Sequence, residues 1–298
     1  MTFRLKDKYL ALYSIPEVTN YIQEFFNTSK FQRPRVRYSV DRKCVSYFDV
    51  KAFQENKTKK FVAINKDNIL SELAQGTSHF YTHIFDDDCL INGLSNYDNW
   101  DYKGFVYNFK EYAESNIKGI TYVVDIDSPR VYPNIAGNTE RYDFFQYINS
   151  FDEATKLVAE QLDDITEYNC MFSGNGFYFI LESEYGSPED INTYKLLIEE
   201  RLNKVDEYLK EMNIPIIIGA KMEGWSRYYK FPFVFHRSRP RISIPLNNNQ
   251  IGHINEQWLN QVTNTSNIIK FNSIDNEYNI DVGILKEIIN KANWSKIW

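Results

Sequence analysis

The alternation of hydrophobic and polar positions along the chain predicts both helices and strands. Between residues 9 and 26, apolar side chains recur at helical spacing, and Pro16 either shortens this helix or marks its first turn. The stretch 35–50 alternates and is rich in β-branched and aromatic residues, which predicts strands. A short helix is predicted over residues 65–73 and a strand over residues 80–85. The first part of the chain therefore reads as a mixed α/β region.

The clearest pattern lies in the middle of the chain. Residues 119–129 are apolar for most of their length and end in polar positions, which is typical of a buried strand. Ser150 and Glu153 have the spacing of a capping box and predict the start of a helix there. Ser187-Pro188 predicts the start of a second helix. Strands are predicted in residues 170–183, 214–220, 228–235 and 241–246, and helices after residue 250.

Composition places the chain among globular proteins. It has 298 residues, of which 43% are hydrophobic and 25% charged, and this balance excludes wholesale disorder. No apolar run has the length of a transmembrane helix, so we expect no membrane partner. The three cysteines are far apart in sequence and include no C-x-x-C pair. We therefore expect a cytoplasmic protein without a disulfide framework and without structural zinc.

The formal net charge of −6 argues against a simple nucleic-acid binder. One segment differs from the rest of the chain. Residues 221–241 hold six Lys and Arg residues against a single acid, Glu223. We expect this segment to meet an anion.

Asp125 and Asp127 stand at the end of the apolar run 119–129. Alternate residues of a strand point to the same face, so both carboxylates project together. Two neighbouring carboxylates repel each other unless a divalent cation lies between them, and Mg²⁺ and Mn²⁺ prefer such oxygen ligands. A D-x-D also arises by chance in a chain with 40 acids, but its position at a strand end favours a metal site.

Two further constellations follow along the chain. In Ser173-Gly174-Asn175-Gly176, the glycines allow the backbone to approach a ligand, and successive N–H groups can bind an anion. The same residues also suit a plain hairpin turn, and both interpretations remain open. Later, Lys230 lies within the predicted strand 228–235 and His236 follows it. The plain alternative there is a solvated basic edge with a structural histidine.

The order and spacing of these three segments resemble the archaeo-eukaryotic primase superfamily, which includes the small catalytic primase subunit and the primase-polymerases. In that family an apolar strand ends in D-x-D, a S-G-x-G-x-H motif follows, and a basic strand then runs into P-G-S-x-H. Pro232 and His236 keep the spacing of this last motif. Two positions depart from the pattern: Tyr178 stands where the family has histidine, and the nearest third acid is Glu223 instead of aspartate. The resemblance covers roughly residues 5–250.

The resemblance implies an α/β (α+β) fold in which mixed β-sheets form a cleft and helices flank them. Residues 1–115 would form the N-terminal α/β portion of the primase core, 116–250 the catalytic portion and 251–298 a C-terminal helical tail. The implied activity is template-directed nucleotidyl transfer by a DNA primase or primase-polymerase, with two Mg²⁺ or Mn²⁺ ions roughly 4 Å apart. The implied partners are single-stranded DNA template and primer, nucleoside triphosphates (NTP or dNTP), and a helicase, a large primase subunit or CRISPR adaptation proteins.

The resemblance also assigns roles to individual residues. Asp125, Asp127 and Glu223 would be the catalytic metal ligands. The nucleotide would be bound by Ser173, Gly174, Asn175, Gly176, Tyr178, Lys230, His236 and Arg237. Further contacts to phosphate or nucleic acid would come from Arg130, Arg227, Arg239 and Arg241.

Two other functions remain open. Metal-dependent glycosyltransferases also bind nucleotide-sugar diphosphates through a strand-end D-x-D, but such an activity does not account for the basic strand that ends at His236. A non-catalytic nucleic-acid-binding replication module of primase fold is the second alternative, and the departures at Tyr178 and Glu223 motivate it.

Overall fold

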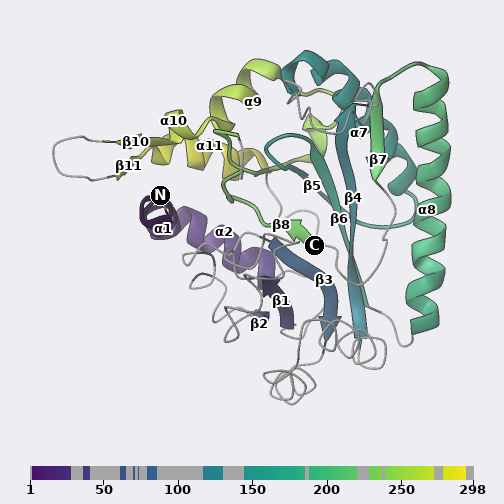
Figure 1. The fold of residues 1–298 in the computed structure, drawn as a ribbon, viewed down its shortest axis with the longest axis horizontal. Coiled ribbons are helices and arrows are strands. Elements are labelled where there is room, and N and C mark those ends of the chain that lie inside the picture. The colour runs from purple at the N-terminus through teal and green to yellow at the C-terminus, as the bar shows by residue number, and fades with distance from the viewer. Residues whose placement is uncertain are drawn as a thin grey trace.

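The computed structural model of the chain describes the residues 2–27, 36–40, 61–64, 70, 73, 79–85, 117–129, 144–184, 188–219, 228–236, 239–271 and 278–292. Among these residues, one large β-sheet forms the centre of the molecule, and helices lie on both sides of it (Figure 1). The protein is therefore mixed α/β, as the sequence predicts.

The described strands form a nine-stranded sheet in which neighbours along the main path follow the order β2-β1-β3-β4-β6-β5-β9. The first half of β4 pairs with β3 and its second half with β7, so these two strands share one edge of β4. In the same way, β4 and β8 share one edge of β3. The strands are β1 (Val36–Val40), β2 (Phe61–Ile64), β3 (His79–Phe85), β4 (Ile117–Pro129), β5 (Asn169–Phe172), β6 (Phe177–Glu184), β7 (Ile216–Gly219), β8 (Tyr228–Lys230) and β9 (Ile244–Leu246).

The middle of the sheet is built from two interlocked β-α-β units. The chain runs from β4 through α7 (Ile148–Leu162) to β5, and then from β6 through α8 (Pro188–Glu211) to β7. In space, β6 lies between β4 and β5, while β4 lies between β7 and β6. This β-α-β-β-α-β order with split units is the ferredoxin-like arrangement. It places the end of β4 in the interior of the sheet.

The core lies between this part of the sheet and α7. Phe151 of α7 packs against Phe177 of β6, with ring centroids 6.0 Å apart, and Phe144 of the preceding 3₁₀ turn η2 (Phe144–Tyr147) packs against Phe172 of β5 at 5.0 Å. Tyr122, Val124 and Ile126 of β4 are buried with them. Because these three residues alternate along β4, they lie on one face of the strand and pack in the core, while Val123 on the other face is buried as well.

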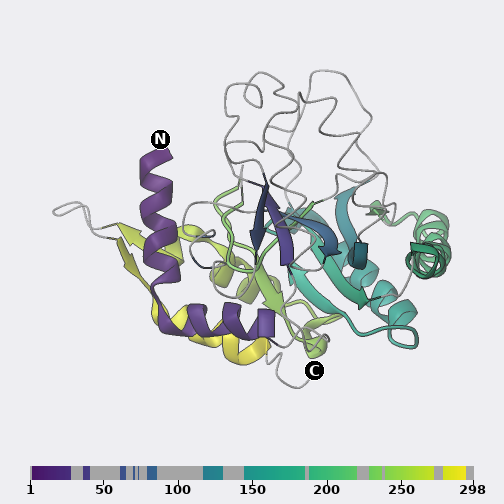
Figure 2. The same cartoon turned by 90° about the horizontal axis from the view of Figure 1, so that it is seen from below.

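Two N-terminal helices lie on the side of the molecule opposite α8 (Figures 1 and 2). The predicted single helix is divided into α1 (Thr2–Tyr13) and α2 (Pro16–Asn27), and the two helices meet at a bend. Pro16 is the first residue of α2, where its missing N–H costs no helical hydrogen bond. Tyr9 is fully buried, whereas Leu10 is 47% exposed.

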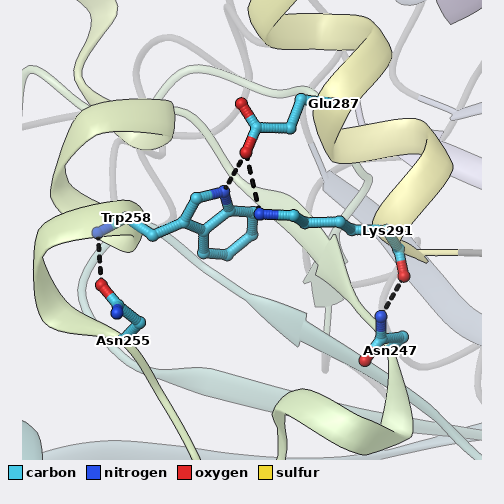
Figure 3. Close-up of polar contacts among 5 residues, drawn as sticks. All are labelled: Asn247, Asn255, Trp258, Glu287 and Lys291. Atoms are coloured by element: carbon cyan, nitrogen blue, oxygen red, sulfur yellow. Dashed lines mark hydrogen bonds and ion pairs between the residues drawn. The ribbon is translucent and has the colours of Figure 1, made fainter.

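The C-terminal region contains the helices α9 (Glu256–Thr263), α10 (Thr265–Ile268) and α11 (Val282–Ala292) and a short 3₁₀ turn η3 (Asn248–Gln250). Besides these predicted helices, it holds a two-stranded sheet of β10 (Ile269–Phe271) and β11 (Tyr278–Ile280). Polar contacts join α9 to α11 (Figure 3). Glu287 accepts hydrogen bonds from Trp258 Nε1 at 2.9 Å and Lys291 Nζ at 2.8 Å.

Two expectations need correction. The sheet was expected to be mixed, but every pairing among the described strands is antiparallel. The reason is that each crossover helix skips one place in the sheet, and an antiparallel strand fills that place. In addition, α7 begins at Ile148 and Ser150 lies inside it, because burial of Phe144 and Ile148 draws the preceding residues into helical structure.

Among the helices in the described part of the chain, none combines the length and the apolar character needed to cross a membrane.

Candidate functional site

The second half of β4 carries Asp125 and Asp127 on the face of the strand opposite Val124 and Ile126. The two core residues are fully buried, whereas Asp125 is partly buried and Asp127 is exposed. The buried apolar residues therefore determine to which face of the sheet the two acidic side chains point. If the pairing register of β4 shifted by one residue, both carboxylates would be buried in the core. This confirms that the two acids lie on a strand, at its polar end.

The segment Ser173–Gly176 forms the tight turn between β5 and β6. Ser173 N donates to Gly176 O at 2.8 Å, so two residues, Gly174 and Asn175, make the loop. Gly174 has φ +101° at the first central position, where a type II′ hairpin turn takes glycine. The hairpin interpretation of this motif is therefore confirmed.

This turn lies directly against the aspartates. A Cβ atom at Gly176 would lie 2.3 Å from Ile126 O, 3.0 Å from Asp127 Cα and 3.3 Å from Asp127 Oδ1. Only a residue without a side chain allows such an approach. The hairpin turn and the D-x-D motif are thus in contact, although about fifty residues separate them in the sequence.

Lys230, in β8, contacts the same turn. Lys230 is only 8% exposed, and its Nζ donates to Ser173 O at 3.1 Å. Burial lowers the pKa of Lys230 to about 8, and the nearby carboxylates of Asp127 and Asp125 oppose that shift. The ammonium group lies next to both acids and to the turn.

His236 lies on the other side of the turn. The position of a Cβ atom at Gly174 would be 2.9 Å from both Cβ and Cδ2 of His236, so the imidazole packs on this glycine. Nδ1 of His236 accepts the backbone N–H of Arg239 at 3.1 Å. The neutral imidazole must then carry its proton on Nε2, which leaves this nitrogen as a hydrogen-bond donor.

Tyr178 belongs to the same group of residues. It pairs directly with Asp125 across β6 and β4, and directly paired residues project from the same face of a sheet. The position that carries histidine in the primase pattern thus lies beside the first aspartate. Its phenol is partly buried and can donate or accept a hydrogen bond there.

The remaining site residues from the sequence fall into two groups. Arg239 and Arg241 follow His236; the guanidinium group of Arg241 lies 4.5 Å from the ring centroid of Phe145 and packs on that ring. Four further residues lie outside the described residues, namely Arg130, Glu223, Arg227 and Arg237. Their proposed contacts stay predictions.

The donor set at the end of β4 suits a divalent metal ion. Two carboxylates share one face of β4, and Asp127 is exposed. Mg²⁺ and Mn²⁺ are bound in this way by one or two carboxylates together with substrate phosphates. In the part of the chain that the structure describes, no group of three His, Cys, Asp or Glu residues is placed to hold a metal ion.

Sequence reasoning missed three residues that shape this site. Ser243, fully buried, accepts the N–H of Val234 at 2.9 Å and donates to Phe231 O at 2.7 Å. The hydroxyl groups of Tyr9 and Tyr13 in α1 contact the backbone of Phe235 and Phe233, next to Val234. Their spacing of four residues, on the buried side of an N-terminal helix, was the available signal.

The geometry thus places two acids, a glycine turn, a lysine and a histidine from distant parts of the chain around one point. No protein-family model matches the chain, and a search of the curated proteins finds no significant match.

Proposed function

We propose that the chain is a nucleotidyltransferase, a DNA primase or primase-polymerase that adds nucleotides on a single-stranded DNA template. The observation that carries the proposal is the meeting of three sequence segments. Asp127 lies against Gly176, Lys230 donates a hydrogen bond to Ser173 O, and His236 packs on Gly174. A site that binds a metal-bound nucleoside triphosphate needs carboxylates for the metal and cations for the phosphates, and this site holds both.

Each residue has a role that follows from its chemistry. Asp125 and Asp127 would hold divalent cations, which stabilise the attacking 3′-oxygen and the leaving pyrophosphate. Lys230 supplies a positive charge for the triphosphate, and Ser173 O holds its ammonium group in place. In this proposal, Nε2–H of His236 and the hydroxyl group of Tyr178, which lies beside Asp125, would donate to phosphate oxygens.

Lys230 and His236 also distinguish this proposal from a glycosyltransferase. A D-x-D alone accounts for a metal-bound diphosphate. The buried Lys230 and the histidine on the glycine turn add further groups that can bind phosphate beside the acids, and this favours a triphosphate substrate. We therefore place nucleotidyl transfer first.

The experiment is a synthesis assay on single-stranded DNA with labelled nucleoside triphosphates and Mg²⁺ or Mn²⁺. It is run without and with a primer, and it compares the wild type with Asp125→Asn and Asp127→Asn. Asp164→Asn is the matched control, because Asp164 is an exposed acid that pairs with Arg201 at 3.3 Å. New oligonucleotides from the wild type and the control alone are the expected result.

Other outcomes separate the alternatives. Extension of a supplied primer without synthesis of a new one identifies a polymerase that does not initiate. If the wild type binds single-stranded DNA but gives no product with any metal or primer, the enzyme proposal is wrong and the non-catalytic replication module replaces it.

A further inference from the structure

We propose that Tyr9 and Tyr13 of α1 are positioning residues that hold His236 against the glycine turn. What His236 binds rests on the proposed function, but the positioning itself is a property of the fold. It links the N-terminal helix to the candidate site through hydrogen bonds to the segment 233–236.

The two tyrosines form one rigid unit. They lie one helical turn apart on α1, and their rings stack at 7° with centroids 5.7 Å apart. Both side chains are buried. Tyr13 Oη donates to Phe233 O at 2.9 Å, and Tyr9 Oη accepts the N–H of Phe235 at 3.2 Å. A single helix therefore contacts the backbone on both sides of Val234.

The contacted backbone needs such support. Phe233 has φ +61°, which is unusual for a residue with a bulky side chain and persists only where neighbouring groups over-determine it. Tyr21 of α2 packs edge-on against the Phe233 ring at 5.3 Å, and the ring of Tyr9 packs edge-on against Phe235 at 4.8 Å. The N-terminal helices thus fix the two aromatic residues that precede His236.

The opposite side of the segment is held by residues 241–243. Phe233 N donates to Ser243 O at 2.8 Å, and His236 N donates to Arg241 O at 2.8 Å. These bonds leave Phe233 O and Phe235 N pointing to α1, where the two hydroxyl groups meet them. Loss of either hydroxyl leaves a buried backbone group without that partner, and the segment can restore hydrogen bonding only by moving.

Such a movement reaches His236 directly. His236 follows Phe235 in the chain, and its ring is in close contact with the Gly174 backbone. A small displacement of the segment therefore shifts the imidazole relative to the turn and to Lys230, which is bonded to the same turn. A tyrosine that served only the core would stabilise the protein without this effect on the imidazole.

The test uses Tyr13→Phe and Tyr9→Phe, which keep the stacked rings and remove one hydroxyl each. Tyr168→Phe is the matched control, because its partly buried hydroxyl donates to Asp163 Oδ1 at 2.7 Å, in a pair that does not involve the segment 233–236. Two readouts are measured at a temperature at which all variants are folded. The first is the imidazole resonance of His236 by NMR, assigned with His236→Ala among only four histidines. The second is the affinity for inorganic tripolyphosphate with Mg²⁺.

We expect Tyr13→Phe and Tyr9→Phe to shift the His236 resonance and to weaken tripolyphosphate binding about three- to tenfold, while Tyr168→Phe changes neither. In a His236→Ala background, Tyr13→Phe should have little further effect on binding, since both changes act through one imidazole.

The outcomes separate this inference from the proposed function. An unmoved His236 resonance, or a loss of affinity that adds fully to that of His236→Ala, overturns the positioning role. If the resonance shifts but the wild type binds no tripolyphosphate, the positioning role holds and the nucleotide site is wrong.

Discussion

Gly176 is the residue whose missing side chain brings the hairpin turn to β4. Its would-be Cβ lies 2.3 Å from Ile126 O, and a backbone atom in a sheet cannot move aside as a flexible side chain can. The approach of the turn to Asp127 therefore depends on glycine at this position. The N-G pair in the sequence indicates a turn, but it contains no information on which strand the turn meets.

Gly176→Ala should separate the turn from β4. We expect the free energy of unfolding to fall by more than about 2 kcal/mol through overpacking, and nucleotide incorporation to be lost. Urea denaturation measures the first effect and the synthesis assay the second. Gly283→Ala is the control, because a Cβ there meets only the side-chain oxygen of Asp281, at 3.1 Å, near the start of α11. Equal stability of the two variants would contradict the close approach.

Ser243 supports the segment that carries His236 from the side opposite α1. Ser243→Ala removes the acceptor of Val234 N and the donor to Phe231 O, both buried. We expect a loss of about 1–3 kcal/mol in the free energy of unfolding. Thr193→Ala, which removes an exposed hydroxyl bonded to Glu189 O, should change stability little. A fully stable Ser243→Ala protein would show that these bonds do not hold the segment.

At the scale of single elements, local sequence patterns predicted some boundaries and missed others: α8 begins at Pro188 as expected, whereas the expected strand 228–235 ends at Lys230 as β8. Residues 119–129 were predicted as a strand, and β4 spans Ile117–Pro129, because a mostly apolar run of this length that is rich in β-branched and aromatic residues favours a buried strand. The capping-box pattern at Ser150 was overridden, since burial of Ile148 extends α7 toward its N-terminus. A helix end is decided by tertiary contacts that the local pattern does not contain.

The contact between α9 and α11 makes stability depend on pH. The hydrogen bond from Lys291, and to a lesser degree that from Trp258, lower the pKa of Glu287 below its ordinary value of 4.5. The carboxylate therefore stabilises the folded state above that value, and this contribution is lost as the pH falls through the lowered pKa.

Glu287→Gln should consequently be less stable than the wild type at neutral pH. The difference should shrink at a pH well below the ordinary carboxyl value, where Glu287 is protonated in both states. Urea denaturation at the two pH values measures it, with Glu207→Gln, an exposed residue of α8, as control. A difference that does not change with pH would mean that the ion pair in Figure 3 contributes nothing.

At the scale of the whole molecule, the order of strands was beyond what the sequence could predict. Each β-α-β crossover skips one place in the sheet, and which strand fills that place depends on pairing between distant residues. The sequence patterns suggested the candidate residues of the site, but not the contacts between Lys230 and Ser173 or between His236 and Gly174. Those contacts arise only when β8 pairs with β3 and the segment 233–236 folds back on residues 241–243.

The central claim is that three distant segments form a single site for a metal-bound nucleoside triphosphate. Equilibrium binding of a nucleoside triphosphate with Mn²⁺ tests it most directly, with one variant for each part of the site: Asp127→Asn, Lys230→Met and His236→Ala. Each variant should lose most of the affinity, while Asp164→Asn keeps it. Wild-type affinity in all three variants, or no binding by the folded wild type, would contradict the claim.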